Sequence, residues 1–315
     1  MLNIPAANIL DRAETILLAG AGGGYDLYTG LPLYFALRAA GKTVHLANLS
    51  FATIYACNGL RIDPAIVEIN SKTTANQPYF PELHLARWLK TQDEPDTIYC
   101  IDRTGAAPVA AAYKALCERL NPDAILLVDG GTDSLMRGDE PMLGTPQEDI
   151  ASLAAVSTLN VETKLLACVG FGIDTFHGVC HHYVLEAMAD LVQLNAFKGV
   201  WSLSHDMPEV KRYHDATDYV FNIQRGQRSI VNSSILAAAK GHFGDYHTTM
   251  RTEGSELYIN PLMSLYWFFE ADAVTRRNLY VDSIRKTQTY TELSLAIEAF
   301  RDTLPVTKPW ITLPM

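Results

Sequence analysis

The chain has 315 residues, of which 48% are hydrophobic and 19% are charged. This is the composition of an ordinary globular protein, and it excludes disordered and fibrous classes. The 25 basic and 35 acidic residues give a net charge of −10. We therefore expect neither nucleic acid nor a membrane surface as a partner, because both usually require a basic patch.

The five cysteines are an odd number and show no C-x-x-C spacing. This pattern argues against a disulfide framework and against a structural zinc site. The N-terminal segment has no basic stretch followed by an apolar one, and no apolar run approaches ~18 residues. We therefore expect a cytoplasmic protein without a signal peptide or a membrane span.

Short apolar runs alternate with amphipathic stretches of helical length. The expected strands are Thr15–Ala19, Thr43–Leu49, Ile66–Ile69, Thr97–Ile101, Ala124–Val128, Lys164–Val169 and Val200–Leu203. The expected helices are Tyr25–Ala40, Pro81–Lys90, Ala107–Leu120, Pro146–Thr158, Tyr183–Leu194, Pro208–Ile223 and Ser229–Lys240. Continuous apolar strands separated by helices predict a parallel sheet that is covered on both faces.

The C-terminal part of the chain is less regular. Glu256–Ile259 predicts a short strand, and Ala271–Leu304 predicts one or two helices. The aromatic run Leu262–Phe269 predicts either buried core or a contact between copies in a homo-oligomer. The expected fold is α/β, with a mostly parallel sheet in a three-layer arrangement. We expect one domain over residues 1–315, with its core at about 12–250 and a C-terminal helical extension at about 251–315.

Ligands of open parallel sheets bind beyond the carboxyl ends of the strands, so the residues that follow each strand are informative. Aspartates recur there: Asp26, Asp102, Asp129, Asp133, Asp174 and Asp206. Each of them can also be a turn or capping residue. Their recurrence favours a site, and it predicts a cleft at this edge of the sheet that requires a cation.

The first strand ends in the glycine-rich run Gly20–Gly24, before a predicted helix. A G-x-G-x-x-G loop would have glycine or alanine where Tyr25 and Leu27 stand, and Asn48 stands where an acid would bind ribose. We therefore expect no NAD. Backbone amides before a helix can hold phosphate or carboxylate, although the glycines can equally serve close packing. The candidate ligand-binding residues of this part are Gly22, Gly23, Gly24, Tyr25, Asp26 and Asn48.

The segment Val128–Asp149 carries six acidic residues and one basic residue, Arg137. Carboxylates this close are costly to ionise together unless a cation offsets them, and hard divalent cations take such oxygen ligands. We expect Asp26, Asp129 and Asp133 to bind Mg²⁺ or Ca²⁺, with turn and capping roles as the alternative. Glu148 and Asp149 are expected to stabilise the dipole of the following helix. The further candidates for ligand contact are Arg103, Gly130, Gly131 and Thr132.

Three histidines are candidates for proton transfer. His177 and His181 have an i, i+4 spacing, and Asp174 lies one turn before them. His205 follows another strand, beside Asp206. Each histidine can also be a packed or solvent-facing residue. The candidate catalytic residues are His177, His181, His205 and Asp174.

Three stretches carry a family resemblance. They are G-A-G-G-G-Y-D at 20–26, V-D-G-G-T-D-S-L-M-R-G-D-E at 128–140 and L-G-T-P-Q-E-D at 143–149. They resemble the uncharacterised family named domain of unknown function 1152, over most of the chain. The resemblance implies a Rossmann-like α/β fold and no particular activity. The D-G-G-T-D core at 129–133 is also similar to the acidic glycine loop of D-glutamate cyclases.

These features together predict an enzyme acting on a small substrate that carries phosphate or carboxylate. We expect hydrolysis, or a lyase or cyclase step, in an acidic and metal-dependent cleft. The alternatives are a non-catalytic nucleotide or metabolite sensor and a divergent dinucleotide-dependent oxidoreductase.

Overall fold

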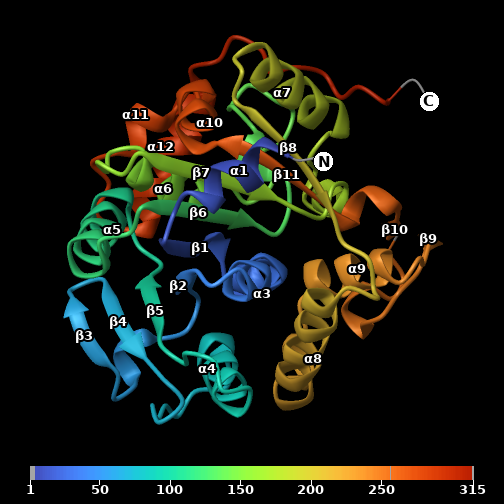
Figure 1. Cartoon of the computed structure of the whole chain (residues 1–315). Coiled ribbons are helices and arrows are strands. Elements are labelled where there is room, and N and C mark those ends of the chain that lie inside the picture. The colour runs from blue at the N-terminus through green and yellow to red at the C-terminus, as the bar shows by residue number, and fades with distance from the viewer. Residues whose placement is uncertain (1–3, 256, 314–315) are drawn as a thin grey trace.

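The structure is a computed structural model that describes residues 4–255 and 257–313. Nine strands form one sheet (Figure 1). They are β1 (Thr15–Gly23), β2 (Thr43–Ser50), β3 (Leu60–Asp63), β4 (Ile66–Ile69), β5 (Ile98–Asp102), β6 (Ala124–Asp129), β7 (Thr163–Cys168), β8 (Phe197–Ser202) and β11 (Leu265–Glu270). Their order across the sheet is β3-β4-β5-β2-β1-β6-β7-β11-β8, and β4 and β11 run antiparallel to their neighbours. The strands β9 (Gly244–Asp245) and β10 (Tyr258–Ile259) form a separate antiparallel pair.

Helices cover both faces of the sheet. One face packs against α5 (Ala106–Leu120), α6 (Pro146–Val156), α7 (His181–Gln193), α10 (Ala271–Arg277), α11 (Val281–Ile284) and α12 (Tyr290–Asp302). The other face packs against α1 (Pro5–Asp11), α2 (Asp26–Thr29), α3 (Leu31–Ala39), α4 (Pro81–Thr91), α8 (Pro208–Ile223) and α9 (Ile230–Ala239). Short 3-10 helices η1 to η6 lie in the connections: Ile54–Ala56, Asp133–Leu135, Ile173–His177, Arg225–Gln227, Met250–Thr252 and Pro261–Ser264. The expected three-layer α/β fold is confirmed.

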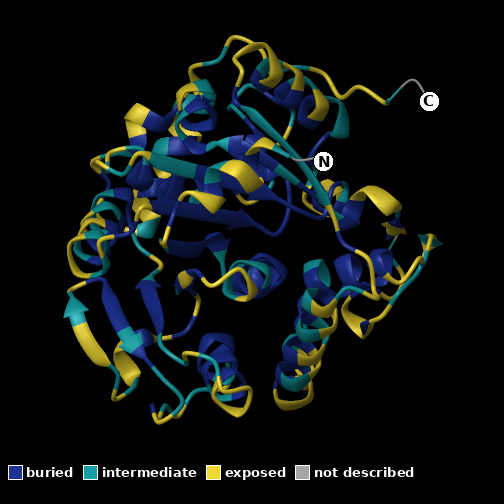
Figure 2. Ribbon diagram, in the orientation of Figure 1, coloured by how far each residue is buried: buried dark blue, intermediate teal, exposed yellow. Residues whose placement is uncertain are grey.

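The apolar strands supply side chains to two cores. In β1, Leu17 and Ala19 belong to one core, while Ile16 and Leu18 belong to the other. Figure 2 shows the result as a buried sheet inside partly exposed helices. This two-sided burial explains why the strands are continuous apolar runs rather than alternating ones.

The connections between strands reverse direction at the centre of the sheet. From β1 the chain proceeds through β2 to β5 on one side, and then crosses to β6 and β7 on the other side. The carboxyl ends of the adjacent parallel strands β1 and β6 therefore form a topological switch point. In open α/β sheets the ligand crevice lies at this point.

The helix expected over Tyr25–Ala40 is divided into α2 and α3. Gly30 separates the two helices, and Pro32 stands in the first turn of α3. Proline has no N–H and tolerates only the first turn of a helix, so a continuous helix through this point is disfavoured. The strand before them, β1, continues to Gly23, beyond its expected end at Ala19.

The C-terminal aromatic run becomes a strand inside the sheet. Strand β11 lies between β7 and β8 and is antiparallel to both. Tyr266, Phe268 and Phe269 are at most 2% exposed, so the buried-core interpretation is confirmed. The expected C-terminal extension thus contributes a strand to the main sheet as well as the helices α10 to α12.

Two smaller expectations have different outcomes. The strand expected over Glu256–Ile259 includes a residue outside the described part of the chain, and β10 occupies its last two positions. The edge strand β3 was not expected, because its Arg61 and Asp63 carry charges and little of it is buried. None of the described helices is long and apolar enough to cross a lipid bilayer.

A buried acid supports the loop that follows β1. Asn48 on β2 donates hydrogen bonds to the carbonyl oxygen of Gly24 and to Oε1 of Glu82 on α4, each at 2.8 Å. Both side chains are 0% exposed, and none of the described residues forms a hydrogen bond with Oε2 of Glu82. Burial therefore raises the pKa of Glu82 from 4.5 to about 7, although the hydrogen bond from Asn48 opposes the shift.

The replacement Phe269→Ala tests the position of β11 between β7 and β8. We expect a loss of about 3–5 kcal/mol in the free energy of unfolding, because removing this buried ring leaves a cavity between the sheet and the helices that cover one of its faces. Urea titration of the wild type and the variant measures this loss. As a control, Tyr258→Ala removes an aromatic side chain that is 61% exposed. This control should change stability by no more than about 0.5 kcal/mol, and equal losses in the two variants would contradict the assignment.

The replacement Glu82→Gln tests the buried acid. Protonated Glu82 stabilises the folded state below its ordinary pKa of 4.5, and this contribution is lost as the pH rises through about 7. The difference of two to three pKa units corresponds to about 3 kcal/mol. Urea titrations at pH 5 and pH 8 should show a smaller decrease in stability for Glu82→Gln than for the wild type. The exposed control Glu298→Gln should retain the full decrease.

Candidate functional site

Three carboxylates meet at the switch point between β1 and β6. Asp26 is the first residue of α2, Asp129 is the last residue of β6, and Asp149 lies in the first turn of α6. Each offers one oxygen, and these oxygens all lie within 4.8 Å of one another. Asp129 is 2% exposed and Asp149 is 4% exposed, whereas Asp26 keeps part of its surface open to solvent. We call these three residues the carboxylate cluster.

The hydrogen bonds of the carboxylate cluster are unequally distributed. Oδ2 of Asp26 accepts from the N–H of Gly22 at 2.9 Å, and Oδ2 of Asp129 accepts from the hydroxyl of Ser134. Within residues 4–255 and 257–313, Oδ1 of Asp149 has no hydrogen-bond partner, although the residue is buried. A buried polar atom without a partner lowers the stability of the folded state, so we expect this oxygen to bind an external group.

Two further carboxylates lie beside the carboxylate cluster and are held in place by hydrogen bonds. Oδ2 of Asp133 accepts from the N–H of Thr145 at 2.8 Å and from its hydroxyl at 3.1 Å. Oδ2 of Asp174 accepts from the N–H of Thr132 at 2.6 Å. Both aspartates are therefore oriented by the backbone of neighbouring loops.

Burial dominates the electrostatics of these five residues. It raises the pKa of Asp26, Asp129, Asp149 and Asp174 well above the ordinary value, and the negative charge of neighbouring carboxylates raises it further. Burial also raises the pKa of Asp133, where hydrogen bonds act in the opposite direction. Shared protons or a bound cation relieve such repulsion.

Gly22 and Gly23 allow close approaches at the end of β1. A Cβ atom on Gly22 would collide with Oδ2 of Asp26 and would lie 3.2 Å from Oδ1 of Asp149. A Cβ atom on Gly23 would collide with the ring of Phe51. These glycines therefore make room for the protein's own side chains, as the close-packing interpretation of the loop requires.

The candidate histidines have three different surroundings. His177, in η3, is exposed, and its proximity lowers the pKa of Asp133 against the effect of burial. His181 stacks on Phe171, its Nε2 lies 2.6 Å from the hydroxyl of Thr175, and burial lowers its pKa. His205 lines a separate hollow of about 300 Å³ between the end of β8, α8 and α9. The geometry thus associates His177 with the acidic site.

The other candidate ligand residues also have definite places. Arg103 lies 3.8 Å from Glu148, and its guanidinium lies over the rings of Phe51 and Tyr290. Asn48 is fully buried and donates a hydrogen bond to the carbonyl oxygen of Gly24, so it stabilises the loop after β1 from within the core. The turn after β6 passes beside the side chains of Asp26 and Asp174. It contains three further candidates, Gly130, Gly131 and Thr132.

Four of the six aspartates expected at the edge of the sheet interact with one another, and two do not. Asp102, at the end of β5, accepts a hydrogen bond from the hydroxyl of Tyr55 at 2.8 Å. Asp206 pairs with the hydroxyl of Ser204 in the exposed turn after β8. The antiparallel strand β11 separates β8 from β7, and this separation places Asp206 away from the switch point.

Asp149 was not expected among the metal ligands, because its place in the first turn of a helix already had a structural explanation. A signal for it exists in the sequence. The residues that follow it in α6 are apolar or small on every side, and Glu148–Val156 are all buried. A helix that is apolar all round is buried, so its N-terminal carboxylates are carried into the interior with it.

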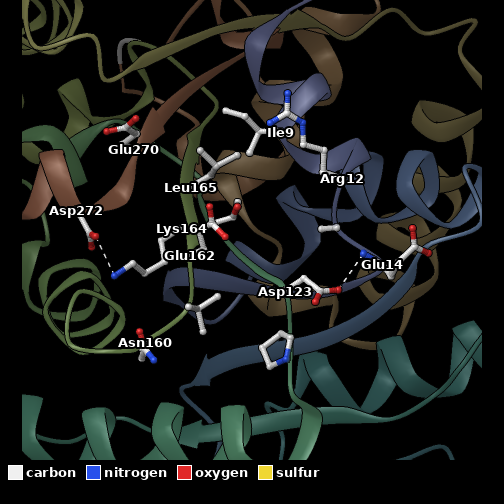
Figure 3. Close-up of a pocket in the computed structure, with 14 residues that line it drawn as sticks. Ile9, Arg12, Glu14, Asp123, Asn160, Glu162, Lys164, Leu165, Glu270 and Asp272 are labelled. Atoms are coloured by element: carbon white, nitrogen blue, oxygen red, sulfur yellow. Dashed lines mark hydrogen bonds and ion pairs between the residues drawn. The ribbon is translucent and has the colours of Figure 1, made fainter.

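A larger hollow, of about 740 Å³, opens at the opposite edge of the sheet (Figure 3). Several of its charged groups already have partners: Lys164 pairs with Asp272 at 2.9 Å, and Asp123 accepts from the N–H of Glu14 at 3.0 Å. This hollow lies at the amino ends of β1, β6 and β7, away from the edge where such sheets bind ligands. The carboxylate cluster is therefore the better candidate site.

Comparison with known proteins gives a family but no activity. No curated protein and no solved structure matches the chain significantly, so the similarity of residues 129–133 to D-glutamate cyclases receives no support. One family model matches residues 49–301. The match contains the acidic stretches at 128–140 and 143–149 and begins after the glycine-rich run of β1. The chain belongs to the family described as protein of unknown function (DUF1152).

Proposed function

We propose that the carboxylate cluster binds a hard divalent cation and that the protein is a cation-dependent enzyme. The observation that carries this proposal is the side chain of Asp149, which is buried beside Asp26 and Asp129 and whose Oδ1 has no hydrogen-bond partner in the described part of the chain. Magnesium and calcium prefer carboxylate oxygens, and magnesium usually binds one or two of them together with water and substrate. A cation also offsets the repulsion among carboxylates whose pKa is raised by burial.

Asp26, Asp129 and Asp149 would bind the cation directly. The amide of Gly22 and the hydroxyl of Ser134 orient the first two carboxylates, which is the usual role of groups behind metal ligands. A cation here would polarise a substrate oxygen or activate water. His177, exposed beside Asp133, is the candidate for transferring the proton.

The charge of the site favours an anionic substrate only after the cation is bound. Five carboxylates repel phosphate and carboxylate groups, and a bound cation supplies the attraction that this edge of the sheet otherwise lacks. The activity that fits best is hydrolysis, or a lyase step, on a small metabolite that carries phosphate or carboxylate. Cation binding would then precede substrate binding.

Asp149→Asn provides a test of the metal site by differential scanning fluorimetry. Saturating Mg²⁺ or Mn²⁺, at about 100 times its dissociation constant, should stabilise chelator-treated wild type by about 2.7 kcal/mol. The variant should bind the cation at least about tenfold more weakly. Without cation the variant should melt higher than the wild type, because it lacks one of the carboxylates that oppose each other's ionisation in the interior.

The matched control is Asp282→Asn, whose side chain is 92% exposed on α11. This variant should respond to the cation like the wild type. If Mg²⁺, Mn²⁺ and Ca²⁺ all leave the melting temperature of the wild type unchanged, the metal site does not exist.

His177→Ala provides a test of the enzymatic role. With phosphate monoesters and carboxylic esters as substrates, the variant should retain cation affinity and lose about 10²–10⁴-fold in kcat, because it lacks the group that transfers the proton. The control His214→Ala changes a histidine that pairs with Asp218 on α8, and kcat should not change. Turnover that is equal in His177→Ala and wild type would remove His177 from the mechanism.

A further inference from the structure

A second hollow, of about 500 Å³, adjoins the carboxylate cluster at Asp26. At the edge of the sheet it is lined by Gly23, Asp26 and the η3 residue His177. Two residues from the C-terminal part of the chain also line it, Ser229 just before α9 and Arg251 of η5. Ligand pockets are common at the switch points of α/β sheets, and this hollow adjoins one.

Aromatic rings line this hollow and remain partly open to solvent. Phe176 of η3 is 57% exposed, and Phe51 after β2 is 43% exposed. Tyr79 also lines the hollow, and its ring lies 5.9 Å from that of Tyr25. Exposed rings in a concave surface offer flat apolar area to a planar ligand. Stacking on such rings tolerates any nucleobase, because every base has a π-face.

Arg251 brings a positive charge to the lining of this hollow. Arg251 is exposed, and its Nη1 donates to the carbonyl oxygen of Arg228 at 2.7 Å, which directs the guanidinium. Within residues 4–255 and 257–313, no carboxylate forms an ion pair with it. The N-terminus of α9 also lines the hollow, and the helix dipole adds a partial positive charge there. Arginine is well suited to bind phosphate through paired hydrogen bonds.

We propose that this hollow binds a nucleoside phosphate. The phosphate lies between Arg251 and the cation at Asp26, and the base lies against Phe176. This inference rests on the proposed function for the cation and names the class of substrate that the site accepts. A simple phosphate would make no use of the rings, and an uncharged aromatic ligand would make no use of Arg251. The volume of about 500 Å³ lies within the range of small-molecule sites.

Isothermal titration of the full chain with ADP, GDP, CDP and UDP, each with Mg²⁺ and with EDTA, tests the proposal. The nucleoside diphosphate that binds most tightly is then compared with two partial ligands. The free nucleoside lacks the phosphates, and ribose 5-phosphate lacks the base. The expected result is that the diphosphate with Mg²⁺ binds at least about tenfold more tightly than either partial ligand, because it contacts both the rings and Arg251.

Two variants separate the contribution of Arg251 from that of the aromatic rings. Arg251→Gln should weaken the nucleoside diphosphate and ribose 5-phosphate by about tenfold or more and leave the free nucleoside unchanged. Phe176→Ala should weaken the diphosphate and the nucleoside and leave ribose 5-phosphate unchanged. The control Phe243→Ala removes a ring that is 66% exposed but does not line the hollow, and it should change none of these affinities.

The possible outcomes distinguish this inference from the proposed function. Tight Mg²⁺ binding without binding of any nucleoside diphosphate overturns the inference alone. Diphosphate binding that persists in EDTA and depends on Arg251 and Phe176 supports the hollow while the cation proposal fails. Diphosphate binding that neither variant weakens overturns the assignment of the ligand to this hollow.

Discussion

The burial of several carboxylates at one point is the constraint on which the rest of this site depends. Asp129 and Asp149 are almost inaccessible, and Asp26 completes the carboxylate cluster from α2, which follows the neighbouring strand β1. Each carboxylate opposes the ionisation of the others, since the low polarity of the interior strengthens their repulsion. The surrounding backbone is arranged to tolerate this: an amide and a hydroxyl each satisfy one oxygen, and one oxygen of Asp149 is left for an external partner.

The topology of the sheet explains why these residues meet. The chain leaves β1 towards β2 on one side and leaves β6 towards β7 on the other, so the loops after these two adjacent strands diverge. Asp26 and Asp129 belong to these two strand ends, and α6 delivers Asp149 from the helical layer. Gly22 then permits Asp26 and Asp149 to approach each other across the backbone of β1. Three separate elements thus contribute one ligand oxygen each.

The part of the site that follows local rules was predictable, and the part that depends on distant packing was not. Asp26, Asp129, Asp133 and Asp174 follow strands whose apolar character marks them, and parallel strands end at one edge. Asp206 satisfies the same local rule but lies elsewhere, because β11 enters the sheet between β7 and β8. Asp149 breaks the rule in the opposite sense, since it begins a helix and reaches the cluster only through the burial of α6. The hollow beside Asp26 depends on Arg251, more than 200 positions further along the chain, which no local pattern relates to it.

The sequence by itself determined the class of the fold, the layering and the edge of the sheet that carries the acidic residues. These follow from hydrophobic periodicity and from the geometry of parallel strands, both of which are local. The tertiary structure decided the position of β11, the three members of the carboxylate cluster and the partners of each carboxylate. These depend on contacts between segments far apart in the chain, and such contacts are set by how whole helices and strands pack rather than by the residues beside each aspartate.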